Sequence, residues 1–272
     1  MGKGEVARPV EAPAGAPGSP RTIKARLAAQ FGALAAVSLG WLMPLRGVCA
    51  PVFHCHSCPL ATFACPLGVI TNFVGLRVWP LITIGVLGLA ASFGGRIWCG
   101  WACPFGLLQD GLRKLPVRKR ELPRWTRGVK YAVLGVLVLG VPAVAPGSFW
   151  SFCGFCPAGT LESAIPWTIM GAASPLRWSF ALRVGILLGV LALATVVPRG
   201  FCRALCPLGA ILAIGNRFSL LRMHPRAEGC TSCGRCARQC PMGMHPLREM
   251  NGPECTRCGE CLDTGCIGQG AE

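Results

Sequence analysis

Eight of the 18 cysteines lie in one C-terminal stretch with regular spacing. They form a C-x2-C-x2-C-x3-C-P pattern (Cys230, Cys233, Cys236 and Cys240) and a C-x2-C-x2-C-x4-C pattern (Cys255, Cys258, Cys261 and Cys266). The first pattern is typical of a bacterial [4Fe–4S] cubane, where closely spaced thiolates wrap one corner of the cluster and another comes from farther away. The second is a slightly stretched copy. Two adjacent clusters predict a relay of single electrons.

Where two such motifs occur together, they exchange their fourth cysteine. We therefore expect cluster A to be held by Cys230, Cys233, Cys236 and Cys266. We expect cluster B to be held by Cys255, Cys258, Cys261 and Cys240. A structural zinc site is the alternative, but zinc usually takes paired C-x2-C units that are well separated in sequence. Residues 222–272 are thus predicted to form a small cytoplasmic bacterial ferredoxin-like domain with two [4Fe–4S] clusters.

The composition of the chain indicates a membrane protein. Of its 272 residues, 52% are hydrophobic and only 14% are charged, whereas about a quarter are charged in a typical soluble domain. The net charge of +16 could serve nucleic-acid binding. However, the basic residues form blocks beside apolar stretches without aromatic interleaving, which favours membrane topology and no nucleic-acid partner. The cysteine motifs favour metal clusters over the disulfides of a small secreted protein.

Four apolar stretches predict membrane-spanning helices, each near the lower limit of about 17 to 25 residues. They are Leu27–Met43, Val78–Phe93, Val129–Val144 and Phe180–Val197. The predicted fold class is an all-α membrane protein. Its four transmembrane helices form two repeated hairpins over residues 27–221, ahead of the ferredoxin-like domain. Residues 1–26, rich in Gly, Pro and Ala, are predicted to be a disordered cytoplasmic tail.

The distribution of charge predicts the orientation in the membrane. Basic residues are dense in the loop 97–130 and after residue 199, whereas segments 45–77 and 147–178 hold only Arg46, Arg77 and Arg177. The positive-inside rule then places both termini and the central loop in the cytoplasm of a bacterium, with two cysteine-bearing loops outside the inner membrane. The alternative is a signal peptide cleaved near Cys49, which the long polar N-terminal segment and Pro44 disfavour.

A hairpin unit of span, outer cysteines, span and inner cysteines occurs twice. Residues 99–106 (CGWACPFG) match residues 202–209 (CRALCPLG), and each copy follows a span. A pseudo-twofold axis along the membrane normal would bring the cysteines of the two copies together as an inner four-thiolate cluster site. These cysteines are Cys99, Cys103, Cys202 and Cys206. Proline after the second cysteine ends the local helix and the glycine permits a sharp turn. Buried free thiols in helix-end packing are the alternative.

The outer loops carry Cys153 and Cys156-Pro157, with Cys55, Cys58 and Cys65 as counterparts. The tetrapeptide Cys-Pro-x-Gly thus occurs twice on each face of the predicted membrane domain. We expect Cys153 and Cys156, with two or three of the other outer cysteines, to hold an outer iron–sulfur cluster. Structural or redox-active disulfides are an alternative in an oxidising compartment, and copper or zinc is a further one.

The remaining cysteine and the histidines offer weaker candidates. Cys49 has no counterpart in the repeat and is expected to be a packed or spare thiol. His54 and His56 flank the outer motif and could bind a metal, although a lone loop histidine is usually not a ligand. His224 and His245, near the C-terminal motifs, have no stronger claim. No C-x-x-C-H motif occurs, so covalent c-type haem is not indicated.

The cysteine motifs resemble those of a known family. Residues 98–106 (WCGWACPFG), residues 201–210 (FCRALCPLGA) and the two C-terminal motifs are similar to the polyferredoxin-type membrane proteins of anaerobic respiration. This family includes the NapH-type membrane quinol-dehydrogenase subunit of periplasmic nitrate reduction. It also includes the NosR-type protein that supports nitrous oxide reductase. The resemblance covers residues 27–266, although the outer C-x2-C-P loops are additional to the NapH-type pattern.

The resemblance implies an electron-transfer subunit of an oxidoreductase in the cytoplasmic membrane. Electrons would pass between the quinol pool or a cytoplasmic donor and a periplasmic reductase or its maturation system. The implied cofactors are [4Fe–4S] clusters, with quinone as a further candidate, and the implied partners are the lipid bilayer and a periplasmic redox protein. A NosR-type flavin role is not expected, because no large flavin-binding domain precedes the first span.

Two other functions compete with this interpretation: a membrane thiol–disulfide relay through the outer C-x2-C pairs, and a factor for metal-cofactor maturation.

Electron transfer between the inner and outer sites also meets a distance problem, because a hydrocarbon layer about 30 Å thick is too wide for one efficient hop. Short spans and Gly94-Gly95 could draw the two sites inward, or a quinone could complete the circuit. Arg96 and Arg203, beside the inner motif, would favour the reduced cluster, or they would serve only as positive-inside anchoring.

Overall fold

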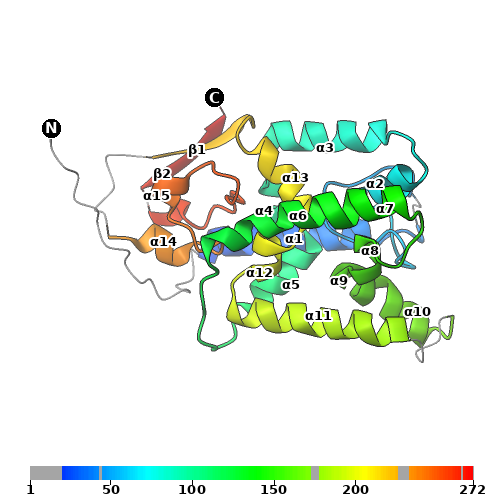
Figure 1. The fold of residues 1–272 in the computed structure, drawn as a ribbon. Coiled ribbons are helices and arrows are strands. Elements are labelled where there is room, and N and C mark those ends of the chain that lie inside the picture. The colour runs from blue at the N-terminus through cyan, green and yellow to red at the C-terminus, as the bar shows by residue number, and fades with distance from the viewer. Residues whose placement is uncertain (1–19, 43–44, 173–177, 226–232, 265, 272) are drawn as a thin grey trace.

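The computed structural model describes residues 20–42, 45–172, 178–225, 233–264 and 266–271. Four long helical elements run roughly side by side, and a small C-terminal domain lies at one end of them (Figure 1). The long elements are α1 (Pro20–Val37), α3 (Leu81–Gly94), the continuous helix Arg124–Val144 and α11 (Trp178–Val196). A helix therefore lies in each of the four apolar stretches of the sequence.

Two of these helices have the length and apolar composition of membrane spans. Arg124–Val144 has 21 residues and Trp178–Val196 has 19, which corresponds to about 30 Å at 1.5 Å per residue. By contrast, α3 is apolar but has only 14 residues, and α1 begins with a basic segment. The arrangement of four transmembrane helices in two hairpins stays a prediction.

The start of the chain differs from the expected tail. Residues 1–19 lie outside the described residues, but Pro20 to Arg26 form the first turns of α1, which ends at Val37 and not at Met43. The prediction of a disordered segment up to residue 26 is therefore wrong for its last part. The reason is that Arg26 is buried and pairs with two acidic residues far away in sequence, Asp110 and Glu260.

The helix Arg124–Val144 contains a π-helical segment. Its parts are η1 (Arg124–Gly128), α6 (Val129–Val133), the π-helical η2 (Leu134–Gly140) and α7 (Val141–Val144). Pro142 follows η2 by two residues. Pro166 has the same place after a second π-helical segment, η3 (Thr160–Ala164), at the start of α10 (Ile165–Ile169). Because proline cannot donate the usual helical hydrogen bond, the wider turn ahead of it lets the helix continue.

Short helices carry the cysteine motifs. Those of the inner motif pack on the long helices: α5 contacts α1 and α11, and α13 contacts α3 and α6. The inner helices are α4 (Ile97–Trp101), α5 (Pro104–Leu112), α12 (Gly200–Ala204) and α13 (Pro207–Gly215). The outer helices are α2 (Pro66–Gly75), α8 (Phe152–Phe155) and α9 (Pro157–Gly159).

The C-terminal domain begins at Leu221 with β1 (Leu221–Pro225). This strand pairs antiparallel with β2 (Ile267–Ala271), so that Leu221 lies opposite Ala271. Between the strands lie α14 (Arg235–Gln239), α15 (Pro246–Glu249) and η5 (Leu262–Thr264). The two-stranded sheet closes the domain around its own small core, separate from the main core between the long helices.

The main core is unusual in its chemistry, because thiols and phenyl rings share it. Phe53, Phe105, Phe152 and Phe201 are buried in it together with five cysteines, among them all four of the inner motif. Thiolates buried in this way need either a proton or a metal, since an unpaired charge is costly in an apolar interior. The composition of the core therefore indicates that its cysteines are candidate metal ligands.

Candidate iron–sulfur sites

The inner motif places its second cysteine at the start of a helix. Cys103 and Cys206 have extended backbones (φ −75°, ψ 118° and φ −73°, ψ 111°), and the proline that follows each is the first residue of α5 or α13. Proline is favoured there because the first N–H of a helix has no helical partner. The N–H of Gly209 donates to the Cys206 sulfur over 3.4 Å, and Gly106 has the same relation to Cys103.

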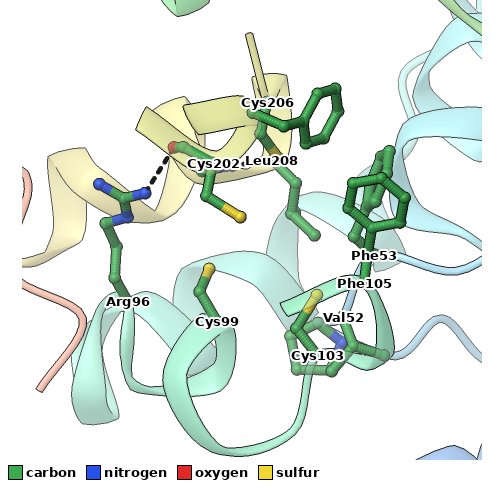
Figure 2. Close-up of a pocket in the computed structure, with 12 residues that line it drawn as sticks. Val52, Phe53, Arg96, Cys99, Cys103, Phe105, Cys202, Cys206 and Leu208 are labelled. Carbon is green, nitrogen blue, oxygen red and sulfur yellow. Dashed lines mark hydrogen bonds between the residues drawn. The ribbon is translucent and has the colours of Figure 1, made fainter. Parts of the chain in front are cut away.

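The two copies of the motif meet at one pocket, called here the inner site. Its four thiols, from Cys99, Cys103, Cys202 and Cys206, are all buried. They line the pocket together with Phe53, Phe105 and Leu208. In Figure 2 the sulfurs of Cys99 and Cys202 approach from opposite sides, and Cys103 points toward the same space. The structure thus brings together the cysteines that the repeat relates, while their binding of a cluster stays a prediction.

The donor set of the inner site fits an iron–sulfur cluster, because a cubane takes four cysteine thiolates, one at each iron corner. The surroundings also fit, because Gln109 Nε2 donates to the Cys202 sulfur over 3.0 Å and hydrogen bonds to sulfur tune such clusters.

Arg96 and Arg203 are buried beside the inner site. Arg96 has no exposed surface and donates to the Cys202 carbonyl oxygen over 2.8 Å and to Glu254 over 3.0 Å. Arg203 is 2% exposed and lies against Gly243 of the C-terminal domain. Both side chains are therefore enclosed by protein.

The loop that carries Cys255 and Cys258 packs directly on the inner motif. A Cβ atom on Gly100 would lie 2.7 Å from the Thr256 carbonyl oxygen and 3.5 Å from the Cα of Cys258. Only glycine allows so close an approach of two backbones. The indole N–H of Trp101 also donates to the Arg257 carbonyl oxygen over 3.1 Å. The second C-terminal motif and the inner site are thus immediate neighbours.

Several C-terminal cysteines are neighbours, while their binding of clusters stays a prediction. Cys240 interacts electrostatically with Cys255 and Cys258, and Cys261 interacts with all three. These four are the residues expected to hold cluster B. For cluster A, Cys236 and Cys266 share the small core of the domain, and Cys233 is exposed. Cys230, the remaining predicted ligand of cluster A, lies outside the described residues.

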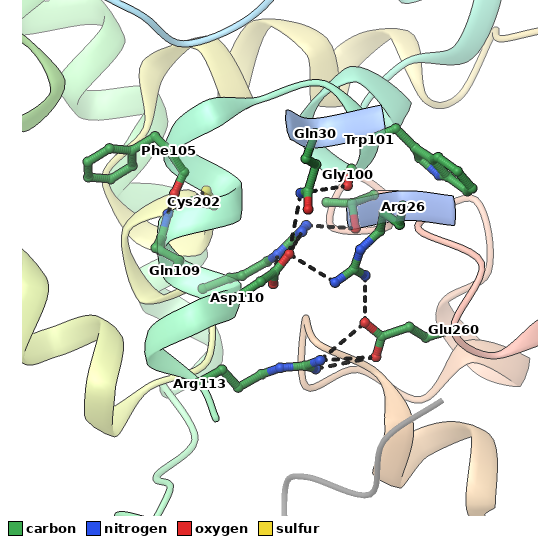
Figure 3. A network of polar contacts seen from close by, with 12 residues as sticks. Arg26, Gln30, Gly100, Trp101, Phe105, Gln109, Asp110, Arg113, Cys202 and Glu260 are labelled. Atoms are coloured by element: carbon green, nitrogen blue, oxygen red, sulfur yellow. Dashed lines mark hydrogen bonds and ion pairs between the residues drawn. The ribbon is translucent and has the colours of Figure 1, made fainter. Parts of the chain in front are cut away.

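Two buried ionic networks join the C-terminal domain to the helices. In the first (Figure 3), Asp110 accepts from Arg199 over 2.6 Å and from Arg26 over 3.0 Å, and Arg26 and Arg113 also reach Glu260. Burial alone would raise the pKa of the Asp110 carboxyl, but the surrounding guanidinium groups outweigh it and hold this pKa at about 2.

In the second network, Glu254 accepts from Lys130 and from Arg96. In both networks a glutamate of the C-terminal domain pairs with cations from the helical part of the chain that precedes it. Sequence reasoning missed these acids. A signal was present, because the chain has only 11 acidic residues and Asp110 lies seven residues after Cys103.

The outer cysteines repeat this local design. Cys65 and Cys156 have the same extended backbone (φ −72°, ψ 124° and φ −63°, ψ 119°) and precede the first prolines of α2 and α9. The Gly159 N–H donates to the Cys156 sulfur over 3.4 Å, and Gly68 has the same relation to Cys65. Cys153 lies on α8.

The other candidate ligands on the outer side have different surroundings. Cys58 has Glu162 and Arg46 as charged neighbours. Cys49 is buried in a bridge to Ala64. One His54 ring nitrogen is 2.8 Å from the Phe63 carbonyl oxygen, which makes His54 a packed core histidine. The His56 ring lies against Gly68.

Comparisons with known proteins bear on both copies of the inner motif. A family model described as a 4Fe-4S binding domain matches the chain twice, at residues 76–123 and 180–226. Each match contains one C-x3-C-P-x-G motif, so the internal repeat and the family agree. No solved structure matches the chain.

Three relatives cover most of the chain. An uncharacterised protein of Methanocaldococcus jannaschii, MJ0750, is 30% identical over 80% of this chain and 90% of its own length. The methylamine utilization ferredoxin-type protein MauN of Methylorubrum extorquens is 31% identical over 66% of this chain and 56% of its own. The regulatory protein NosR of Stutzerimonas stutzeri is 30% identical over 68% of this chain, which is 26% of NosR.

Proposed function

This chain belongs to the NapH/NosR-type family of polyferredoxin electron-transfer proteins, and we propose that it relays electrons across the bacterial cytoplasmic membrane. It binds [4Fe–4S] clusters, which supply one-electron transfer when bound. The relay would connect the quinol pool or a cytoplasmic donor with an acceptor on the periplasmic side. The residues of the chain hold the clusters, keep them apart from water and set the charge around them.

The observation that carries the proposal is the contact between two cysteine-bearing loops. Gly100 lies one residue after Cys99, and the backbone of Thr256 to Cys258 fills the space where its Cβ would be. Thiols of the cluster B motif and of the inner site therefore approach with only one layer of backbone between them. Efficient electron transfer needs this proximity, and a purely structural metal site does not.

Charge around the inner site supports an electron-accepting role. Arg96 and Arg199 are fully buried and both interact electrostatically with Cys202. Positive charge close to a cluster favours the form that carries the extra electron. Asp110 and Glu254 compensate only part of this charge, because Arg26 and Lys130 pair with the same two acids.

The proposed orientation keeps the ferredoxin-like domain in the cytoplasm. The helices Arg124–Val144 and Trp178–Val196 would cross the bilayer, and α1 and α3 would complete the four-helix arrangement. The basic residues of loop 97–130 and the C-terminal domain then share one side. On the other side, a hollow lined by His56, Phe73 and Trp167 is where a quinol or a periplasmic redox protein would approach the outer cysteines.

Serine substitutions in the inner motif test this proposal. Anaerobically purified full-length Cys99→Ser and Cys202→Ser proteins should each lose about four irons and one cluster signal relative to the parent protein. Iron, acid-labile sulfide and EPR spectra during stepwise reduction are the measurements. Cys49→Ser, a buried cysteine outside the motif, is the matched control and should keep its full iron content. Unchanged iron in both inner variants would contradict the proposal.

A further inference from the structure

The outer cysteines Cys65 and Cys156 are built like the inner Cys103 and Cys206. All four have extended backbones with ψ between 111° and 124°, stand before a helix-opening proline, and accept a hydrogen bond from the glycine three residues on. A short helix brings in a further thiol at Cys99, Cys202 and Cys153. One local design thus occurs at both sites.

This design is not a consequence of the tetrapeptide alone. Cys240-Pro241-Met242-Gly243 has the same pattern, but its cysteine accepts from the N–H groups of Met242 and Met244, and Gly243 has a positive φ of 56°. Cys240 shares the extended backbone (φ −65°, ψ 117°), which the following proline favours, but no helix begins at Pro241. The helix that opens at the proline is therefore the feature that the inner and outer motifs share beyond the tetrapeptide.

Four of the outer thiols approach one another. A Cβ on Gly159 would lie 3.7 Å from the sulfur of Cys55 and 3.8 Å from that of Cys156, so these two sulfurs flank one glycine. Cys156 also interacts electrostatically with Cys65 and Cys153, and Cys65 interacts with Cys153 and Cys55. The members come from both hairpin units, as at the inner site.

The polar groups around these thiols are few. The backbone N–H of Cys55 donates to Glu162 over 2.6 Å, which fixes the loop to η3. Burial raises the pKa of Glu162 to about 7. Arg183 of α11 lies near Cys153, with its guanidinium group over the ring of Phe149. The outer thiols are therefore held by packing and backbone contacts, with one acid and one base beside them.

A phenyl cluster connects the inner and outer thiols. Phe53 lies two residues before Cys55 and its ring centroid is 5.6 Å from that of Phe105, 5.4 Å from Phe201 and 6.2 Å from Phe152. The last three rings each lie within two residues of Cys103, Cys202 or Cys153. In addition, Phe53 lines the inner site beside Cys103. One segment thus borders the inner site and carries an outer thiol.

We infer that Cys55, Cys65, Cys153 and Cys156 bind a second iron–sulfur cluster of the membrane domain, in electronic contact with the inner site through the Phe53 segment. The inference rests on the proposed function and extends it to the outer face. The exchange moves one electron: the cluster at one site is oxidised as the other is reduced, and no bond forms or breaks. The inference leaves out Cys49 and also Cys58, which interacts electrostatically with Cys55.

The Phe53 segment also removes the distance problem. Phe53 lines the inner site beside Cys103, and the two residues of chain that join it to Cys55 span at most about 7 Å. The hydrocarbon layer of a bilayer is about 30 Å thick. The two sites are therefore much closer than the two membrane surfaces, and one hop within the protein replaces one across the whole layer.

Serine substitutions in the full-length protein test the ligand set. After anaerobic purification, Cys55→Ser and Cys156→Ser should each lose about four irons and four sulfides per chain and one reducible EPR centre. Cys58→Ser, in the same loop as Cys55, is the matched control and should keep the full iron content. Signals of the C-terminal clusters report whether each variant is folded.

The outcomes separate the inference from the proposed function. If Cys99→Ser loses iron but Cys55→Ser and Cys156→Ser do not, the relay stands and the outer cluster is wrong. A disulfide between outer cysteines in that case, found by mass spectrometry, would establish the thiol relay instead. If Cys58→Ser also loses iron, the assigned ligand set is wrong. In the fully reduced parent protein, spin coupling should broaden the inner signal, and this broadening should vanish in Cys156→Ser.

Discussion

At the inner site, the fully buried Arg96 and Arg199 reach the groups around Cys202, whereas at the outer site the nearest charges are Glu162 and Arg183. The backbone around the thiols is nevertheless the same at both sites. The comparison teaches that the repeat supplies the thiol geometry, while the surrounding charges are set separately. With the same ligands, the more positive inner site should be the easier one to reduce.

The largest effect is expected from breaking the charge network that only the inner site has. Asp110→Asn leaves Arg199 buried without its carboxylate, which should lower the free energy of unfolding by about 3 kcal/mol. The loss of cluster absorbance on heating measures this change. The matched outer variant is Glu162→Gln, which keeps an acceptor for the Cys55 N–H and should change stability by less than about 1 kcal/mol. Equal effects of the two variants would contradict the difference between the sites.

Acid should weaken the same network. The pKa of Asp110 in the folded protein is about 2, below the ordinary value of 3.8, so its ion pairs stabilise the protein fully above pH 4. Their contribution, about 2 kcal/mol, is lost as the pH falls from about 4 to 2. Stability measured over this range should fall more steeply in the parent protein than in Asp110→Asn. Parallel curves would show that another group governs acid unfolding.

The ion-pair networks of Asp110, Glu254 and Glu260 could not be predicted from the sequence. The spacing of the cysteines indicated which of them belong together, because a motif is local. Arg26 and Glu260 are 234 residues apart, so their pairing depends on how the C-terminal domain docks, which hydropathy and motif spacing do not encode. The same holds for residues 20–26, which have the composition of a disordered tail. They are helical in the structure, where Arg26 pairs with Asp110 and Glu260.

The place of Phe53 was hidden in a different way. Local hydropathy assigns loop 45–65 to the outer surface, and nothing in its pattern says that Phe53 is 2% exposed or that it reaches the inner site. The near symmetry of Phe152-Cys153 and Phe201-Cys202 was visible in the sequence. The structural consequence of this symmetry is seen only in the packing of the rings, which form one phenyl cluster that borders both sets of thiols.

The glycine that lets the cluster B loop approach the inner site gives the next prediction. In Gly100→Ala the added methyl group would meet the Thr256 carbonyl oxygen at 2.7 Å and push the cluster B loop away. The expected cost is about 1 to 3 kcal/mol, with slower reduction of the inner site from the ferredoxin-like domain in stopped-flow measurements. Gly88→Ala, where nothing lies within 4 Å of the added Cβ, should be close to neutral in both respects.

Arg96 tests the electrostatic part of the comparison directly. Arg96→Gln removes a buried positive charge beside Cys202, so the reduction potential of the inner site should fall toward that of the outer site. An EPR-monitored redox titration resolves the two. The matched change at the outer face is Arg183→Gln, which should shift only the outer signal. If both signals move together in Arg96→Gln, the two sites share one electrostatic environment and the assigned difference is wrong.

The smallest effect is expected where the two sites meet. Phe53→Leu keeps the backbone that runs from the inner site to Cys55, so this covalent path survives and only the ring contacts with Phe105, Phe152 and Phe201 are lost. Electron exchange between the sites should therefore slow modestly while iron content and both potentials remain unchanged. Phe93→Leu changes an aromatic ring of α3 that is 64% exposed, outside the phenyl cluster, and should leave the exchange rate unaltered. An equal rate in the two variants would show that the backbone alone carries the coupling, and a loss of iron in Phe53→Leu would show that the ring acts by shaping the thiol sites.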